Sequence, residues 1–464
     1  MSDRLASGSA RLDAILDGGL LLNGINLIMG RPGSGKTILA QQYLFHNATA
    51  ERPALYLSTV SEPLEKILRY GQSLSFFDKS VVGTSVIYED LGQSLNGDGL
   101  SGVLAKLVEL LRERRPALMV IDSFKALRAY APDDGTFRRF LHDLAGHLSA
   151  SQTTSFWVGE YDSAEATEAP EFAVADAIVS LGIERSTDRE SRVFQVLKLR
   201  GSGFVSGKHA YRVSNDGIDI FPRLADYEDG DTYDFAPERI SSGVPILDDM
   251  LDDGYWRGAS TLVAGPSGAG KTLIALHFIF CGAELGEQGI FATFQENPIQ
   301  LERVVQGFSW SFKEPNVELM FRPPVDLYLD EWVYDLLELI ERTGAKRVAI
   351  DSLGDLRAAC GDEVRFREYI YSFLQRCVRR NVSVIMTQEV PELFGITRLS
   401  EFGISHVSDN VVLLQFLRGN SEVKRAITVL KTRGSAHDPR IRQFDITSEG
   451  LSLGEQFVAD QSLL

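Results

Sequence analysis

Two glycine-rich segments of this chain have the residue types that bind nucleotide phosphates. Residues 30–37 and 265–272 both fit the pattern G-x-x-x-x-G-K-[ST] and lie 235 residues apart. Glycines let such a loop turn its backbone N–H groups toward phosphate oxygens, the lysine reaches the β and γ oxygens, and the threonine hydroxyl can ligate Mg²⁺. We therefore predict two sites for ATP and Mg²⁺ per chain. The candidate cofactor-binding residues in the loops are Gly33, Ser34, Gly35, Lys36, Thr37, Gly268, Ala269, Gly270, Lys271 and Thr272.

An apolar run that ends in an aspartate follows each loop. These runs are residues 118–122 and 347–351, and they end at Asp122 and Asp351. An aspartate at the end of such a strand can hold the Mg²⁺ shell opposite the loop threonine. The candidate metal residues are therefore Thr37, Asp122, Thr272 and Asp351.

A glutamate follows another strand-like run in each half. We pair Glu62 with Glu296 and expect either carboxylate to orient a water molecule. Together with the loop lysines Lys36 and Lys271, they are the candidate catalytic residues.

Composition excludes several classes of function. The 464 residues carry 47 Lys and Arg against 64 Asp and Glu, for a net charge of −17. This balance disfavours non-specific binding to nucleic acid or to anionic membranes, which depends on basic residues. No apolar run is long enough for a transmembrane helix. Because the N-terminus has no signal pattern and the three cysteines have no disulfide or zinc spacing, we expect a cytoplasmic protein.

The chain is a tandem repeat of one domain of about 230 residues. Ser7-Gly8 corresponds to Ser242-Gly243, and Arg200-Gly201-Ser202 corresponds to Arg433-Gly434-Ser435. We predict a first domain at 1–222, an acidic, proline-bounded linker at 223–238, and a second domain at 239–464. Short apolar strands alternate with longer amphipathic segments in each half. The expected fold class is α/β, with two RecA-like P-loop NTPase domains, each a mostly parallel sheet flanked by helices.

In combination, these motifs resemble the KaiC family, a group of two-domain clock ATPases related to RecA and DnaB. The resemblance runs from about Arg4 to Leu453. It rests on the paired P-loops, the acid after the second strand, Ile-Asp-Ser in both halves, and the two segments 197–202 and 431–435. It implies a homohexameric ring with ATP at the subunit interfaces. The neighbouring subunit would then supply cations to each nucleotide, namely Lys198, Arg200, Lys431 and Arg433.

The chain departs from the family at three places. The family has two adjacent glutamates after the second strand, and the first of these positions is Ser61 in one half and Gln295 in the other. Neither side chain accepts a proton as a carboxylate does, so we expect slow hydrolysis. The extended C-terminal tail through which family members recruit a regulatory partner is also short here, which puts that recruitment and a timekeeping role in doubt.

The third departure concerns phosphorylation. The second domain of the family phosphorylates itself on an adjacent Ser and Thr. Here Ser405 falls on the serine position, His406 falls on the threonine position, and Ser408 follows two residues later. We therefore expect serine autokinase activity in the second domain, with autophosphatase activity as a further expectation and with Ser405 and Ser408 as the candidate acceptors.

Three functional hypotheses remain at this stage. The first is a double-ring ATPase and autokinase used in signalling or timing, with a regulatory or output protein as partner. The second is an ATP-switched oligomeric scaffold with little turnover. The third is a DNA-directed ATPase like RecA or DnaB, which the acidic net charge disfavours.

Overall fold

The computed structural model describes residues 4–59, 63–162, 165, 169–186, 189–224, 236–391, 404–418, 422–447 and 450–456. The chain divides into two compact units, Met1–Arg223 and Leu224–Leu464. Most of the predicted linker, 223–238, lies outside the described residues.

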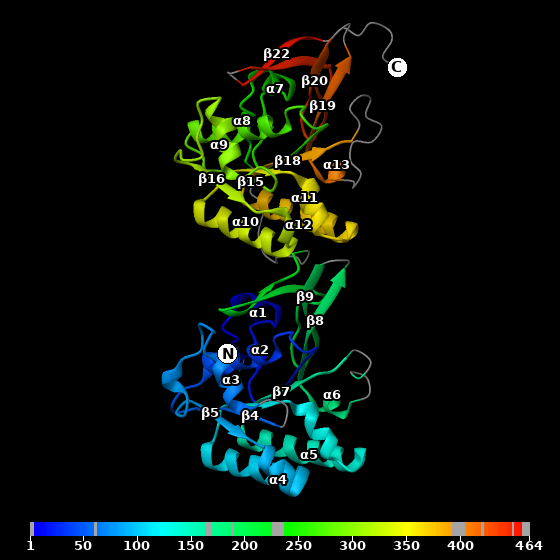
Figure 1. The fold of residues 1–464 in the computed structure, drawn as a ribbon. Coiled ribbons are helices and arrows are strands. Elements are labelled where there is room, and N and C mark those ends of the chain that lie inside the picture. Colours follow the sequence, from blue (N-terminus) through cyan, green and yellow to red (C-terminus); the bar gives the residue numbers. More distant parts are fainter. Residues whose placement is uncertain are drawn as a thin grey trace. The chain divides into compact units, whose positions relative to one another are not determined.

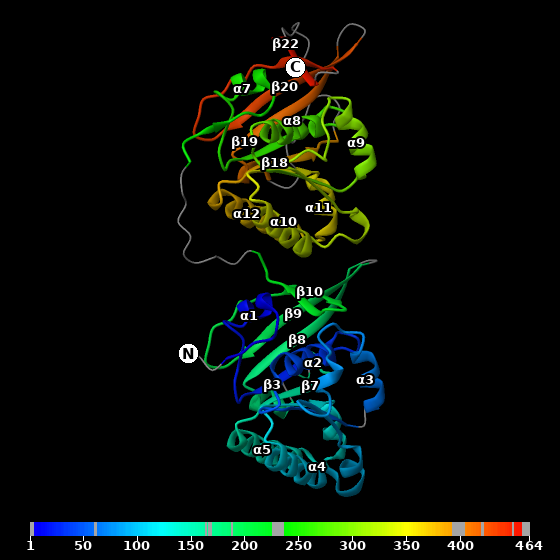
Figure 2. The same ribbon diagram turned by 90° about the vertical axis from the view of Figure 1, so that its left-hand side faces the viewer.

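The first unit is built on a nine-stranded sheet (Figure 1). Its order across the sheet is β11 (Gly217–Phe221), β10 (His209–Ser214), β9 (Arg189–Leu199), β8 (Ala177–Ser186), β3 (Ile25–Gly30), β7 (Thr154–Gly159), β6 (Leu118–Asp122), β4 (Ala54–Ser58) and β5 (Val86–Asp90). The strands from β5 to β8 are parallel, and β9, β10 and β11 are added antiparallel. Figure 2 shows the long β8–β9 hairpin. A small sheet pairs β1 (Arg4–Leu5) with β2 (Leu20–Leu21).

The second unit repeats this topology strand for strand. Its order is β22 (Gly450–Gln456), β21 (Arg442–Thr447), β20 (Val423–Thr432), β19 (Asn410–Arg418), β14 (Ser260–Gly265), β18 (Ser383–Glu389), β17 (Arg347–Asp351), β15 (Gly289–Thr293) and β16 (Val317–Phe321). A second small sheet pairs β12 (Arg239–Ile240) with β13 (Tyr255–Trp256). The shared strand order confirms the predicted α/β class and the tandem duplication.

Helices cover both faces of each sheet. In the first unit these are α1 (Ala10–Ile15), α2 (Lys36–Asn47), α3 (Leu64–Gly71), α4 (Gly92–Arg114), η2 (Phe124–Tyr130), α5 (Asp134–Ser151) and α6 (Pro170–Val174); η1 (Lys79–Val81) is a short turn. In the second they are α7 (Pro245–Met250), α8 (Lys271–Glu284), α9 (Pro298–Gln306), α10 (Leu329–Thr343), α11 (Leu353–Ala359), α12 (Glu363–Arg379) and α13 (Ile404–Val407), with the turn η4 (Pro324–Asp326).

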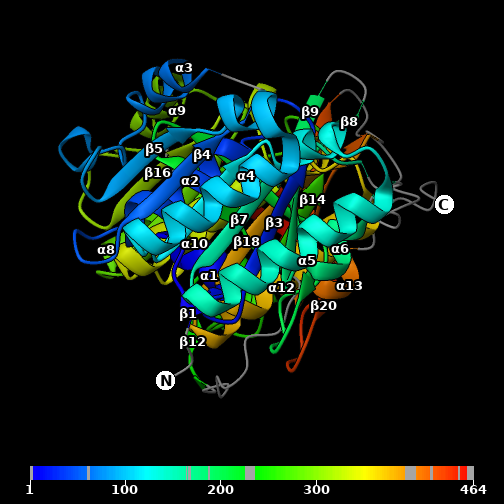
Figure 3. The ribbon, with the colours of Figure 1, turned by 90° about the horizontal axis from the view of Figure 1, so that it is seen from below.

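The apolar core of each unit forms two layers, one on each face of the sheet. In β3, Leu27 and Met29 pack with α4 and α5, whereas Ile28 packs with α1 and α2. Figure 3 shows α4 and α5 running across one face of the first sheet. All six residues of β3 are buried, because a central parallel strand with helices on both faces has no solvent side. The parallel strands therefore present only their carboxyl ends, and the loops that follow them, for ligand binding.

Candidate nucleotide sites

Each P-loop joins the carboxyl end of a central strand to the start of a helix. Gly35 and Gly270 are the N-cap residues of α2 and α8, with φ of 94° and 105°. This left-handed conformation favours glycine, which explains the glycine before each lysine. A Cβ added to Gly33 or Gly268 would meet no atom within 4 Å, so each loop forms an open cradle. The N–H groups of a helix N-terminus line this cradle and favour an anion.

The loop lysines adopt the same arrangement in both domains. Lys36 Nζ donates to Arg31 O at 2.8 Å, and Lys271 Nζ donates to Pro266 O at 2.8 Å. Burial lowers the pKa of each ammonium, although nearby carboxylates partly offset the effect. Ser34 is fully buried, and its Oγ has no hydrogen-bond partner among the described residues. Both features fit a loop that binds a polyphosphate.

The predicted metal residues contact each other within each domain. Thr37 Oγ1 donates to Asp122 Oδ2 at 2.8 Å, and Thr272 Oγ1 donates to Asp351 Oδ2 at 2.7 Å. A hydroxyl and a carboxylate are hard oxygen ligands of the kind that Mg²⁺ takes together with substrate phosphates. The described residues contain no cluster of three His, Cys, Asp or Glu side chains that could hold a metal. The paired hydroxyl and carboxylate oxygens fit, by their chemistry, an Mg²⁺ ion that nucleotide phosphates also ligate.

A second hydroxyl donates to each predicted metal aspartate, and sequence reasoning missed both. Tyr56 of β4 donates to Asp122 Oδ2 at 2.7 Å. In the second domain Phe291 takes the place of Tyr56, and Thr387 of β18 donates to Asp351 Oδ1 instead. Burial raises the pKa of Asp351, while hydrogen bonds from Thr387 and Thr272 act in the opposite direction. The pattern of apolar strands alone does not reveal these partners.

A cavity of about 730 Å³ lies on the first P-loop. Its polar end contains Lys36, Thr37, Asp122 and Glu160, and its other walls come mainly from α2 and α3. The volume falls in the range that small-molecule ligand sites occupy. The first site therefore has room for a nucleotide whose phosphates lie on the P-loop.

The predicted equivalence of Glu62 and Glu296 is wrong by one residue. Ser58 at the end of β4 pairs with Asp122, and Thr293 at the end of β15 pairs with Asp351, so Ser58 and Thr293 occupy equivalent positions. Pro63 and Pro298 keep the same spacing. Glu62 then corresponds to Asn297, and Ser61 corresponds to Glu296. The prediction matched Glu62 to Glu296 because both are glutamates. The paired strand ends instead determine which positions of the two domains correspond.

The structure describes Glu296 but not Glu62. Residues 60–62 lie outside the described ranges, so Glu62 has no assigned position. Glu296 is half-buried, and burial followed by the charge of Asp351 raises the pKa of its carboxyl. Glu296 therefore lies three residues beyond Thr293, which ends β15 opposite the predicted metal aspartate Asp351.

The four predicted cations lie at equivalent positions near the ends of β9 and β20. Lys198 Nζ donates to Phe172 O at 3.0 Å, and Lys431 Nζ donates to Ser408 O at 2.6 Å. Arg200 pairs with Asp176 at 3.1 Å, and Arg433 Nη2 donates to His406 O at 2.6 Å. Burial lowers the pKa of both lysines.

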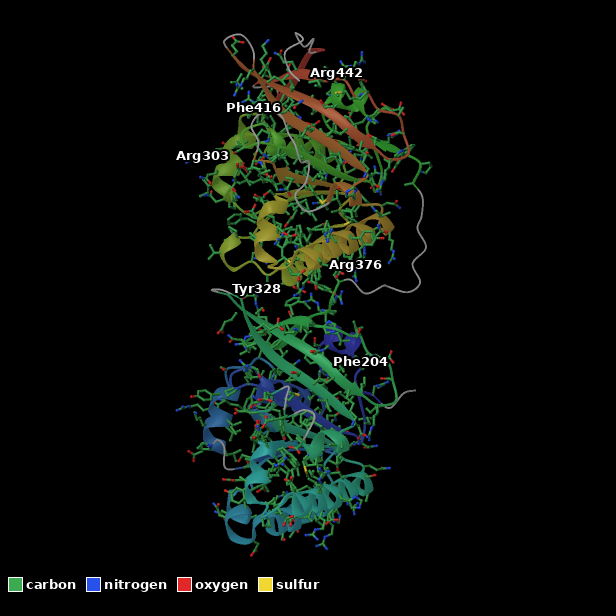
Figure 4. The ribbon with its side chains drawn as sticks, turned by 90° about the vertical axis from the view of Figure 1, so that its right-hand side faces the viewer. Phe204, Arg303, Tyr328, Arg376, Phe416 and Arg442 are labelled. Atoms are coloured by element: carbon green, nitrogen blue, oxygen red, sulfur yellow. The ribbon has the colours of Figure 1, made fainter. Side chains whose placement is uncertain are left out.

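A different arginine on the same strand reaches the P-loop of its own domain. Arg192 Nη1 donates to Gly33 O at 2.8 Å, and its equivalent Arg425 approaches Gly268 O at 3.4 Å. Arg425 also lies over the ring of Phe416, which is labelled in Figure 4. Lys198 is six residues further along β9, or roughly 20 Å at the rise of an extended strand. The predicted cations therefore lie far from their own P-loop.

The predicted acceptor serines lie beside these cations. Ser408 follows α13 and is fully buried, and its carbonyl holds Lys431. The structure describes the backbone of Ser405 in α13, but its side chain lies outside what is described.

Comparison with known proteins agrees with this geometry. A model of the KaiC ATPase family matches the chain twice, over residues 5–225 and 240–457. The chain belongs to the KaiC ATPase family. The circadian clock oscillator protein KaiC of Rippkaea orientalis is 28% identical over 467 residues, which cover 96% of this chain and 87% of the relative. The circadian clock protein KaiC3 of Synechocystis sp. is 29% identical over 473 residues, covering 98% and 92%.

Membership of the KaiC family confirms the resemblance inferred from the motifs, the RecA-like character of both domains and the prediction of an ATP-binding ATPase. Each matched segment carries one of the P-loops and one of the two strand-ending aspartates, Asp122 and Asp351. Within the described parts of this KaiC-family chain, no helix combines the length and the apolarity that crossing a membrane requires.

Proposed function

We propose that this KaiC-family protein is a cytoplasmic double-ring ATPase in which homohexameric rings hold ATP between adjacent subunits. One ring is formed by residues 1–222 and the other by residues 239–464, with 223–238 as the connector. The position of the cations carries this proposal. Lys198 and Lys431 lie at the ends of β9 and β20 that are remote from their own P-loops. They can reach a nucleotide phosphate only if a neighbouring subunit presents it.

The residues of each site have distinct roles in this proposal. Thr37 with Asp122, and Thr272 with Asp351, would hold Mg²⁺, which when bound neutralises charge on the β and γ phosphates. Lys36 and Lys271 exchange their contacts with loop carbonyls for contacts with phosphate oxygens. Cations from the neighbour stabilise the charge that develops on the transferring phosphoryl group.

Hydrolysis is slow because neither site carries the family's pair of glutamates. In the second domain Glu296 is the carboxylate available to orient water, and burial, followed by the charge of Asp351, raises its pKa. In the first domain the position equivalent to Glu296 is Ser61, and Glu62 lies one residue after it. We therefore assign faster turnover to the second domain.

Autokinase activity belongs to the second domain and to Ser405. Ser408 was the alternative acceptor, but its side chain is fully buried within the domain, which argues against it. The Ser405 segment is held against Lys431 and Arg433 through the carbonyls of Ser408 and His406. If these cations contact the neighbour's ATP, Ser405 lies at the same interface. Phosphorylation there would then change the surface offered to a signalling partner.

The test is to incubate the purified protein with Mg·ATP and follow ADP release and intact mass together, beside Lys36→Ala and Lys271→Ala variants. The proposal predicts ADP release and a phosphate adduct on Ser405 that is lost only in Lys271→Ala. ADP without an adduct would remove the autokinase. Bound nucleotide without ADP or adduct would favour the ATP-switched scaffold instead. Stimulation of turnover by single-stranded DNA would favour a DNA-directed motor.

A further inference from the structure

Tyr211 in β10 contacts the first P-loop through its hydroxyl group. Its OH donates a hydrogen bond to Ser34 O at 2.6 Å. Arg192, which the register of β9 and β10 places opposite Tyr211, donates to the preceding carbonyl, Gly33 O, at 2.8 Å. Both strands are labelled in Figure 2. Two successive carbonyl groups of the loop therefore accept hydrogen bonds from side chains of two adjacent strands.

The carbonyl that Tyr211 binds lies just outside helix α2. In a helix the N-cap carbonyl is the first to accept from a helical amide, and here Leu39 N donates to Gly35 O at 2.9 Å. Ser34 precedes this N-cap and is fully buried, so its carbonyl needs another partner. Tyr211 is 5% exposed, and burial raises the pKa of its hydroxyl, while Arg192 acts in the opposite direction. The hydroxyl therefore keeps its proton at neutral pH and can donate it.

This hydrogen bond also fixes the direction of the next amide group. Ser34 C=O and Gly35 N–H belong to one planar trans peptide unit, in which the two bonds point in opposite directions. Because Ser34 O is bound by Tyr211, Gly35 N–H points away from that hydroxyl. Gly35 is one of the residues that line the cavity on the first P-loop, beside Lys36 and Thr37.

The second domain lacks this hydroxyl. Phe444 pairs with Arg425 across β20 and β21 and is the equivalent of Tyr211. Arg425 approaches Gly268 O at 3.4 Å, whereas the equivalent distance for Arg192 is 2.8 Å. The second P-loop thus forms without the tyrosine hydroxyl. A contact that is present in only one of two duplicated domains is not required to fold the loop.

We propose that Tyr211 is a positioning residue of the first nucleotide site and that it orients Gly35 N–H as a donor to a phosphate oxygen. This inference rests on the proposed binding of ATP at the first P-loop. Because the amide is oriented before the nucleotide arrives, less conformational freedom is lost on binding, and the affinity is higher. Tyr211 contacts the loop and takes no part in bond breaking, so it acts on binding alone.

The test uses the full-length chain with Lys271→Ala, so that nucleotide binding reports on the first site. Tyr211→Phe removes only the hydroxyl, and Phe444 shows that a phenyl ring fits this place in the fold. The Kd for a non-hydrolysable ATP analogue with Mg²⁺, measured by isothermal titration calorimetry, should rise about fivefold, the effect of one hydrogen bond. KM for ATP should rise by the same factor while kcat stays unchanged, because the contact is equal in the ground state and the transition state.

The reciprocal substitution separates positioning from a structural role. In the full-length chain with Lys36→Ala, Phe444→Tyr should lower the Kd of the second site at least about twofold, because the new hydroxyl can donate to Ala269 O. The matched control is Tyr130→Phe, which removes a hydroxyl that donates to Asn96 Oδ1 at 3.5 Å on the opposite face of the first sheet. This control should leave the Kd of the first site unchanged.

The outcomes distinguish this inference from the proposed function. An unchanged Kd in Tyr211→Phe or in Phe444→Tyr would overturn the inference while nucleotide binding stands. A lower melting temperature of Tyr211→Phe without a change in Kd would assign the hydroxyl to stability alone and would also overturn it. An equal rise in Kd in Tyr130→Phe would do the same. Absence of any nucleotide from the Lys271→Ala chain would overturn binding at the first P-loop and the inference with it.

Discussion

His277 should make the second domain sensitive to acid. It is 7% exposed in α8, and Leu451 N in β22 donates to its Nε2 at 3.3 Å. Burial lowers the pKa of this imidazole from 6.5 to about 4. In the first domain the equivalent residue is Gln42, whose Oε1 accepts the corresponding hydrogen bond from Ile218 N in β11 at 3.0 Å. His277→Gln therefore replaces a titratable acceptor with a neutral one already used at the equivalent position.

The size of the effect follows from the two pKa values. Between pH 6.5 and about 4 the unfolded chain binds a proton that the folded domain does not, so stability is full above pH 6.5 and is lost as pH falls. Linkage gives a loss of about 2 kcal/mol at pH 5 relative to pH 7.5. The His277→Gln variant should lack this loss, since glutamine does not titrate. At pH 7.5 the two proteins should be similarly stable.

Hydrogen exchange read by mass spectrometry resolves the effect to the domain. Peptides from α8 and β22 of the native sequence should exchange faster at pH 5 than at pH 7.5, after correction for intrinsic rates, and those of His277→Gln should not. Peptides from α2 and β11, which surround Gln42, serve as the internal control. An equal loss of protection in both proteins at pH 5 would show that His277 is not the group whose protonation destabilises the domain.

Three further predictions concern the sites. Tyr56→Phe removes a hydrogen bond to Asp122 and should weaken Mn²⁺ binding with nucleotide at the first site by about 1 kcal/mol, or roughly fivefold, by electron paramagnetic resonance titration; no change would contradict that role. The kcat of the second domain should decrease as the pH falls, and the decrease should begin above pH 4.5, because the raised pKa of Glu296 lets its carboxylate take up a proton there. An identical decrease of kcat at acid pH in Glu296→Gln would contradict this. Mixing Lys271→Ala with Lys431→Ala chains should restore second-domain turnover that neither shows alone, and no recovery would contradict sites shared between subunits.

Much of the fold could be predicted from local patterns. The P-loop motif sets a strand, a turn and a helix within a dozen residues, and both copies form as expected because glycine is needed at Gly35 and Gly270. The contacts of Thr37 with Asp122 and of Thr272 with Asp351 could be expected, because parallel strands end at one edge of the sheet.

Contacts between strands that are remote in sequence could not be predicted in this way. Tyr56 reaches Asp122 because β4 pairs with β6, and no motif specifies that a core-facing tyrosine ends on a carboxylate. The contact between Tyr211 and Ser34 likewise depends on how β10 lies beside the first P-loop. That Glu62 and Glu296 do not occupy equivalent positions follows from the register of the neighbouring strands, which matches Ser58 to Thr293. Residue identity alone is a weak guide to equivalence over so short a segment.

The two P-loops give one chain two ATP sites, and the number of bound nucleotides can be measured. Native mass spectrometry with a non-hydrolysable ATP analogue and Mg²⁺ counts bound nucleotides directly. Our account predicts two nucleotides per chain in the native protein, one in Lys36→Ala, one in Lys271→Ala and none in the double variant. Retention of nucleotide by the double variant, or a native chain that binds only one, would contradict it.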